Sequence, residues 1–292
     1  DLTQDHLENL ENLLPSDIEQ QAINRLTNPK TKKLLEFPHQ AEKFLVESST
    51  YLPELRSRLR CTIIASSFGS SCLKLNESIS TLLDVCNLIL SSDQLSRIMQ
   101  KMLAVGNIMN QGTHRGQATG FTLDSLMKMV NTKGVDKKTS ILDYVVKSTI
   151  EKGDEQLLML DDDLLLIQKH VKLSSKDLSV EVGMMDRDNR LMEKELKNTG
   201  ELVAKSGHSE GEERCKMAEQ YCISLKEEMD SFSEDYSELT RLNQIRARKS
   251  TAIMEYFGED PEVCDTPNIF SVLTSFYTSI IKSREKMKNI VG

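Results

Sequence analysis

The chain of 292 residues carries a net charge of −8, contains 38% hydrophobic and 5% aromatic residues, and has no Trp. This acidic balance argues against a general binder of nucleic acid or anionic membranes, because such proteins present a basic surface. No apolar stretch approaches the roughly 20 residues that cross a bilayer. The many Leu, Met, Lys and Glu residues, with only 6 Pro, favour helices, so the predicted fold class is all-α.

The first part of the chain, residues 1–67, is predicted to form a compact helical region. Apolar residues at helical spacing precede Pro15. Ser16 and Glu19 then have the spacing of a capping box, which predicts the start of a second helix.

A long helix is expected next. Apolar residues keep helical spacing from Cys61 to Leu90, and residues 68–94 are interpreted as one helix that connects two subdomains or joins a bundle. The run Ser91-Ser92-Asp93 is predicted to cap the helix that follows.

The central segment of the chain, residues 95–142, combines two apolar helices with a glycine-rich loop. The first helix leads into Gly106-Asn107-Ile108-Met109-Asn110, and the loop holds Gly112, Gly116 and Gly120. Glycines this close together indicate positive φ angles or close approach of another chain. A second helix is predicted behind Phe121-Thr122, and a polar, lysine-rich segment separates it from Ile141.

Further along, Asp161-Asp162-Asp163 is predicted to begin a helix, where carboxylates suit the helix dipole and solvent. A cation site or catalytic carboxylate pair is the alternative, but no residues at a suitable spacing support it. The basic cluster of Arg241, Arg246, Arg248 and Lys249 is interpreted as a solvated face, with contact to a partner protein as the less favoured alternative.

Two apolar seams with alternating steps of three and four residues predict an antiparallel coiled-coil hairpin over residues 172–250. A segment with Gly200, Gly207 and Gly211 should form its turn, and residues 251–292 should form a C-terminal helix. The first seam comprises Leu178, Val182, Met185, Asn189, Met192 and Leu196. The second comprises Ala218, Cys222, Leu225, Met229, Phe232, Tyr236, Leu239 and Asn243.

No pattern predicts a metal site, a cofactor or an enzyme. The six cysteines include no CxxC pair and are interpreted as reduced thiols, and the five histidines have no metal-ligand spacing. A P-loop, a nucleophile elbow and paired acid/base carboxylates are also absent.

Three blocks of the central segment resemble the formin homology 2 (FH2) domain of the formin family. They are Gly106-Asn107-x-Met109-Asn110, then Arg115-Gly116-x-Ala118-x-Gly120-Phe121, then Thr132-Lys133 before a Ser/Thr-led helix. Two positions depart from the family pattern: Ile108 stands where most members carry Tyr, and Asn131 stands where an Asp is usual. The resemblance extends from Leu10 to about Lys286.

The resemblance implies an elongated helical module with knob, coiled-coil shaft and post subdomains. The knob corresponds to residues 1–67, the first shaft helix to 68–94, the post to 95–171, and the returning shaft to 172–250, before the C-terminal helix. Family members form head-to-tail dimers in which an N-terminal lasso wraps the partner's post. The chain begins too late to include a lasso or linker, so we expect this fragment to be monomeric, although the full-length domain is a homodimer.

The resemblance also implies two sets of site residues. The lasso-acceptor surface comprises Gly106, Asn107, Ile108, Met109, Asn110, Gly112, Gly116, Gly120 and Phe121. The actin contact is centred on Lys133, with Lys128, Lys137 and Lys138 as supporting charges. An ordinary turn and a solvated loop lysine are the alternative interpretations of these two sets.

The implied function is that of a formin's actin-binding core, which contributes to actin filament nucleation and to processive barbed-end capping and elongation when dimeric. The expected location is cytoplasmic, on the cytoskeleton. Actin is the expected partner, with profilin–actin a further partner through flanking regions, and no nucleic acid is expected. The alternative function is a helical coiled-coil scaffold or adaptor without actin activity. Such an adaptor would account for the seams but not for the glycine-rich loop.

Overall fold

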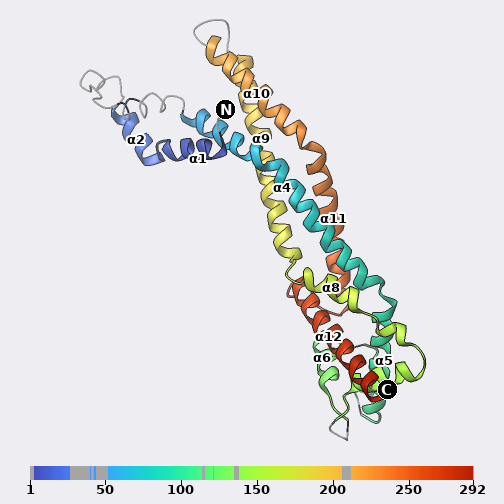
Figure 1. Ribbon diagram of the computed structural model, residues 1–292. Helices are drawn as coiled ribbons and strands as arrows, with labels where there is room; N and C mark the ends of the chain where they lie inside the picture. The colour runs from blue at the N-terminus through green and yellow to red at the C-terminus, as the bar shows by residue number, and fades with distance from the viewer. Residues whose placement is uncertain are drawn as a thin grey trace. The chain divides into compact units, whose positions relative to one another are not determined.

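The computed structural model describes residues 3–26, 40, 43, 52–113, 116–120, 122–134, 138–205 and 212–291, and these residues form helices joined by turns (Figure 1). They include no β-strand, only an isolated bridge between Lys133 and Ser140. The predicted all-α fold class is confirmed. The elements in chain order are α1 (Gln4–Leu13), α2 (Asp17–Leu26), α4 (Leu52–Ser91), α5 (Asp93–Met109), α6 (Leu123–Asn131), α7 (Ile141–Glu151), the 3₁₀ helix η1 (Glu155–Leu158), α8 (Asp161–Lys169), α9 (Ser175–Lys205), α10 (Glu212–Ser231), α11 (Ser233–Tyr256) and α12 (Thr266–Val291).

The chain divides into two compact units. Unit 1 comprises Asp1–Lys74 and Gly183–Glu238, and unit 2 comprises Leu75–Val182 and Leu239–Gly292. The long helices α4, α9 and α11 each contribute residues to both units. The knob, shaft and post boundaries expected from the sequence remain a prediction.

In unit 1, α4 packs with α9 and α10 around a core that contains both apolar and polar side chains. Phe68 is 2% exposed, and its ring centroid lies 4.6 Å from that of Phe232. Glu195 is buried among donors: it accepts hydrogen bonds from the Thr199 hydroxyl at 2.9 Å and from the Ser57 hydroxyl. These partners offset the cost of burying the carboxylate.

Local signals place the first helices where the sequence predicts them. The Ser16 backbone N–H donates to Glu19 Oε2 at 2.8 Å, and the Glu19 N–H donates to Ser16 Oγ at 3.4 Å. This capping box begins α2 as expected. Residues 27–39, which include Pro29 and Pro38, lie outside the described residues.

The core of unit 2 is organised around α12, which packs against α6, α7 and α8 (Figure 1). Phe270, Phe276 and Tyr277 on α12 are fully buried. Helix α12 therefore packs mainly against helices that follow the central segment and, within that segment, against α6.

Two ion pairs fasten the end of α12 inside unit 2. Arg284 forms a fork to Asp161, with nitrogen–oxygen distances of 2.8 and 3.0 Å, and donates to the Leu158 carbonyl at 2.9 Å. Lys286 Nζ lies 2.8 Å from Asp143 Oδ2, and Asp143 also accepts from the Ser283 hydroxyl. The predicted helix start at Asp161 is confirmed, but this carboxylate also forms an ion pair with Arg284.

The interpretation of Arg246 as part of a solvated face is wrong. This side chain is only 6% exposed, and its Nη1 donates to the Ser175 carbonyl at 2.7 Å and to the Ser175 hydroxyl. Its Nε donates to Asn243 Oδ1 at 2.9 Å. Burial lowers the pKa of Arg246, and the acceptors around it offset the cost of that burial.

The predicted seams agree with the structure only in part. Five of the six positions in the first seam are buried, but Leu196 is half-buried, and Thr199 is buried at 1% exposure. The second seam is divided between two helices, because α10 ends at Ser231 and α11 begins at Ser233. The expected turn at Gly200 is wrong, since α9 continues to Lys205, and Gly207 and Gly211 lie outside the described residues.

Candidate functional site

The end of α5 is held to the loop behind it by Asn107. The Asn107 side-chain amide donates to the Ala118 carbonyl at 2.9 Å, and its Oδ1 accepts from the Ala118 N–H at 3.0 Å. An amide side chain can make both bonds at once because it carries a donor and an acceptor. Asn107 therefore fixes the position of the glycine-rich loop in unit 2.

Asn110 ends α5 and begins the turn. Its backbone N–H and its side-chain Nδ2 both donate to the Gly106 carbonyl, at 3.1 and 2.9 Å. Its own carbonyl accepts from the Thr113 N–H at 3.0 Å and the Thr113 hydroxyl at 2.8 Å. Hydrogen bonds of Asn110 to Gly106 and to Thr113 thus join the end of α5 to the first residues of the loop.

The three loop glycines differ in what they require. Gly112 has a φ of +84°, a conformation that glycine adopts without steric cost. A Cβ atom on Gly116 would lie 2.4 Å from the Asn110 carbonyl oxygen, so only glycine fits there without a shift of the backbone. Gly120 has neither property within this chain, so close approach of another chain stays a prediction there.

The predicted lasso-acceptor residues lie largely at the surface. Ile108 is 69% exposed and Met109 is 52% exposed, although both are apolar. Asn110, Gly112 and Gly120 are exposed, whereas Gly106, Asn107 and Gly116 are half-buried. Phe121 lies outside the described residues. Two neighbouring apolar side chains exposed at the end of α5 are suited to contact another protein.

Helix α6 follows the glycine-rich loop in the chain. Thr122 caps the helix, with its hydroxyl accepting from the Ser125 N–H at 3.3 Å. Leu123, Leu126 and Val130 are buried. The exposed edge of α6 contains Asp124 and Lys128, whose charged atoms lie 2.5 Å apart.

A closed hairpin presents Lys133 at the end of α6. The Gly134 N–H donates to the Thr139 carbonyl at 2.8 Å, and the Ile141 N–H donates to the Thr132 carbonyl at 3.0 Å. These bonds flank the bridge between Lys133 and Ser140. Lys133 and Lys138 are exposed, and Lys137 lies outside the described residues. The backbone of Lys133 is thus held while its ammonium group faces solvent.

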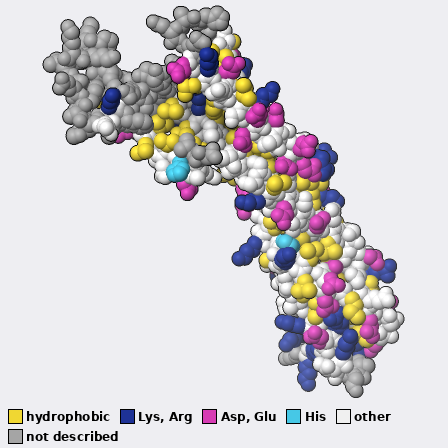
Figure 2. Space-filling model, turned by 45° about the horizontal axis from the view of Figure 1, so that its top comes forward, with side chains coloured by type: hydrophobic (Ala, Val, Ile, Leu, Met, Phe, Trp, Pro, Cys, Tyr) yellow, Lys and Arg dark blue, Asp and Glu magenta, His cyan; other side chains and the backbone are white. Residues whose placement is uncertain are grey.

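An open depression adjoins this hairpin and is lined by Asp124, Met127, Lys128, Asn131 and Thr132. Figure 2 shows Lys and Arg side chains gathered with carboxylates towards the end of unit 2, where α5 and α6 lie in Figure 1. Lys128 is one of the expected supporting charges, but its pairing with Asp124 was not predicted. The i,i+4 spacing of the two residues is the signal that could have shown the pair.

Other classes of site find little support in the described part of the chain. It contains no group of His, Cys, Asp and Glu side chains that could hold a metal ion. Among the described helices, none is long and apolar enough to span a membrane. The cysteines are free thiols, and burial raises the pKa of Cys61 to about 11 and that of Cys72 to about 12.

Ile108 and Met109 at the end of α5 and the exposed Lys133 beyond α6 give this helical chain a surface suited to contact another protein. The chain belongs to the Formin Homology 2 (FH2) domain family, whose model matches residues 1–280. The resemblance in the glycine-rich segment is therefore confirmed. The FH2 domain is a non-enzymatic, actin-binding module, and its family is associated with dimerisation and the cytoskeleton.

Curated relatives agree with this assignment. Formin-like protein 5 of Oryza sativa subsp. japonica is 32% identical over 282 residues, which cover 97% of this chain and 16% of that protein. Formin-like protein 14 of Arabidopsis thaliana is 30% identical over 285 residues, covering 97% of this chain and 21% of that protein. The chain spans about a fifth of the length of these relatives.

Proposed function

We propose that this chain is the actin-binding core of an FH2 domain that, as a dimer, nucleates actin filaments and then caps and elongates their barbed ends processively. Family membership is the observation that carries the proposal. The physical task is to hold two actin subunits in filament-like geometry, which lowers the entropic cost of their association. No bond chemistry is required of the protein.

In this proposal, the surface formed by residues 106–121 accepts the lasso of a second subunit. The exposure of Ile108 and Met109 supports this role, because the lasso can cover apolar area that solvent now contacts. The fixed loop also supports it, since a surface organised before binding loses less entropy on association. Ile108 supplies apolar area where most family members carry Tyr.

Lys133 is the proposed centre of the actin contact on this unit. Its exposed ammonium group can pair with a carboxylate, and its backbone is already held in the hairpin. Lys137 and Lys138 add positive charge that steers an acidic partner towards the surface. Lys128 contributes less, because Asp124 already neutralises much of its charge.

Pyrene-actin assembly with the full-length FH2 domain tests this function. Lys133→Ala should slow filament nucleation by roughly 5- to 30-fold, the effect of losing about 1–2 kcal/mol at an energetic centre. Lys147→Ala is the matched control, because Lys147 is an exposed lysine of the same unit that pairs with Glu151 outside the proposed contact. If the wild-type domain and both variants leave polymerisation unchanged, the chain is a helical adaptor and the proposal is wrong.

A further inference from the structure

A small pocket lies between α4 and α10 in unit 1, far along the sequence from the residues assigned above. Its volume is about 90 Å³, well above the roughly 10–15 Å³ that holds one water. Ala65 and Leu225 are its buried apolar residues, at 5% and 3% exposure. The other lining residues are Thr62, Ser66, Tyr221, Ser224 and Glu228.

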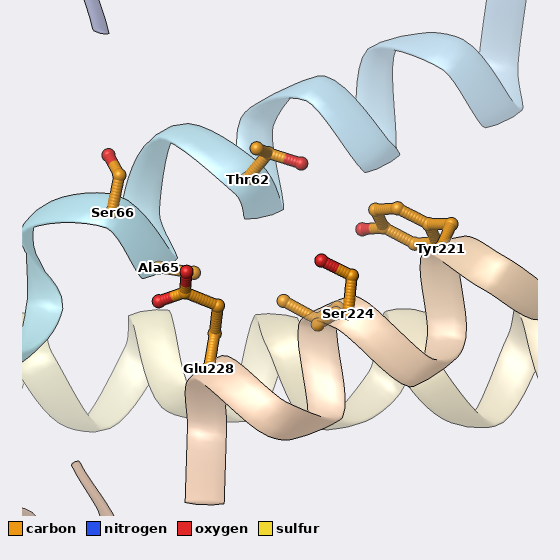
Figure 3. Close-up of a pocket in the computed structure, with 7 residues that line it drawn as sticks. Thr62, Ala65, Ser66, Tyr221, Ser224 and Glu228 are labelled. Atoms are coloured by element: carbon orange, nitrogen blue, oxygen red, sulfur yellow. The ribbon is translucent and has the colours of Figure 1, made fainter. Parts of the chain in front are cut away.

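The oxygen atoms of this pocket are arranged to accept hydrogen bonds. In Figure 3 the oxygens of Tyr221, Ser224 and Glu228 point from α10 into the space beside α4. Thr62 donates its hydroxyl proton to the Arg58 carbonyl at 2.9 Å, and Tyr221 donates its own to the same carbonyl at 3.3 Å. Both hydroxyls therefore have only lone pairs left to offer a ligand.

Two further groups in the pocket belong to exposed residues and receive no hydrogen bond from a described side chain. Among the described residues, no side chain donates to the Glu228 carboxylate or to the Ser224 hydroxyl. The nearby cation Arg58 does not pair with Glu228. Its Nη2 lies 3.7 Å from Glu54 and its Nε lies 3.9 Å from Glu195. Its guanidinium carbon lies 5.5 Å from the Tyr221 ring centroid. The pocket thus combines a carboxylate and several acceptors with a small apolar floor.

A ligand for such a site must carry donors, a positive charge and a short apolar stem. Lysine and arginine side chains both meet this description, since their methylene groups pack on apolar surface while the charged end remains polar. A guanidinium group offers five N–H donors in a plane, whereas an ammonium group offers three around a point. Because acceptors line the pocket on both α4 (Thr62) and α10 (Tyr221, Ser224, Glu228), the group with more donors can make the fuller set of bonds.

We propose that the pocket between α4 and α10 binds the guanidinium group of an arginine presented by a protein partner. This site is separate from the proposed actin contact and goes beyond the assembly function. The floor of Ala65 and Leu225 holds the side-chain stem, and Glu228 supplies the countercharge. An arginine bound here joins α4 to α10 within unit 1 through hydrogen bonds to both helices.

Methyl NMR of the whole chain tests the proposal with capped tripeptides as probes. The methyl signals of Ala65 and Leu225 report binding directly. The probes are Ac-Gly-Arg-Gly-NH₂, the same peptide with lysine, and the same peptide with citrulline, which keeps the shape of arginine but is uncharged. We expect saturable shifts with the arginine peptide, weaker shifts with the lysine peptide and none with the citrulline peptide.

Two matched variants locate the countercharge. Glu228→Gln should weaken binding of the arginine peptide about fivefold, as expected for loss of one partly exposed ion pair. Glu227→Gln removes the same charge from the neighbouring exposed residue, which does not line the pocket, and should leave binding unchanged. Ser224→Leu should abolish the shifts by filling the cavity, and thermal unfolding should remain as in the wild type for all three variants.

Three results would overturn the proposal. They are equal shifts with the citrulline and arginine peptides, equal weakening by Glu228→Gln and Glu227→Gln, and no saturable shift with the arginine peptide. Because no step of the experiment involves actin, its failure is distinguishable from failure of the proposed assembly function.

Discussion

Replacing Gly116 with alanine should loosen the loop that follows α5. The added Cβ would lie 2.4 Å from the Asn110 carbonyl oxygen, 2.9 Å from its carbon and 3.1 Å from the Gln111 Cα. These are backbone atoms, so they cannot rotate away as the end of a flexible side chain could. The crowded carbonyl is also the acceptor for both hydrogen bonds from Thr113.

The expected cost follows from this geometry. Overpacking a well-filled site costs typically about 1–3 kcal/mol. Because the loop can open without unfolding the rest of unit 2, most of this cost should appear as local opening. An opening free energy lower by that amount makes the open state roughly 5- to 150-fold more populated.

Amide hydrogen exchange measures the opening directly. The Ala118 N–H donates to Asn107 Oδ1 and the Thr113 N–H donates to the Asn110 carbonyl, so both amides should be protected in the wild type. In Gly116→Ala both should exchange faster by the factor given above. Gly120→Ala is the control, because a Cβ at that position meets nothing within 4 Å.

The reasoning is refuted if Gly116→Ala exchanges at the wild-type rate. It is equally refuted if Gly120→Ala accelerates exchange as much, because the crowding of Gly116 would then not be the cause.

Further predictions concern the packing of unit 2 and the buried thiols. Arg284→Lys should lower the free energy of unfolding in urea by about 1–3 kcal/mol, because lysine cannot reproduce the fork to Asp161. Burial raises the pKa of Asp143, but hydrogen bonds from Lys286, Ser283 and the Ser140 backbone outweigh it and hold this pKa below 3.8. That stabilisation is present above pH 3.8 and lost as the pH falls through the lower folded-state pKa, so Asp143→Asn should reduce the acid dependence of the urea midpoint. Burial raises the pKa values of the Cys61, Cys72 and Cys86 thiols to about 11 or 12. A thiol reagent at neutral pH should therefore modify these cysteines slowly in the native protein and at full rate in denaturant.

Matched controls distinguish these effects from general damage. Arg97→Lys alters an exposed i,i+4 pair with Asp93 and should change the unfolding free energy by less than about 0.5 kcal/mol. An equal loss in both arginine variants would contradict the role of the Arg284 fork. An acid dependence of Asp143→Asn as steep as that of the wild type would contradict the assigned pKa. Native labelling of the buried cysteines at the denatured rate would contradict their burial.

Helix starts were predictable from the sequence because their signals are local. Ser16, Ser92 and Thr122 each accept a hydrogen bond from a backbone N–H three residues later. Such bonds depend on neighbouring residues alone, so a short pattern is sufficient to predict them. The order of helices around the glycine-rich loop was predictable for the same reason.

Tertiary pairing was not predictable in this way. Arg246 binds Ser175, which is 71 residues away, and Arg284 binds Asp161, which is 123 residues away. A basic residue within a charged run looks solvated until its packing partner is known. The break between α10 and α11 at Phe232 was also not predictable. The apolar spacing of three and four residues is unchanged where α10 ends and α11 begins, so the sequence predicts one continuous helix.

Within the candidate site, the residue types were predictable from the sequence, but the conformation and contacts of each residue were not. The glycine spacing indicated the loop, but the spacing does not distinguish Gly116, which a backbone carbonyl crowds, from Gly120, which has open space beside it. The double hydrogen bond of Asn107 to Ala118 joins residues 11 positions apart and has no local signature.

Binding of a lasso peptide to this chain is the most direct test of the proposed acceptor surface. Isothermal titration calorimetry should show saturable one-to-one binding to the wild type, and Gly112→Val should weaken it at least about tenfold, or 1.4 kcal/mol, by distorting the turn. Gly153→Val is the matched control, because Gly153 also has a positive φ, +79° against +84° for Gly112, and also has open space beside it. The account predicts unchanged binding for Gly153→Val. Absence of binding to the wild type, or equal weakening by the two variants, would contradict it.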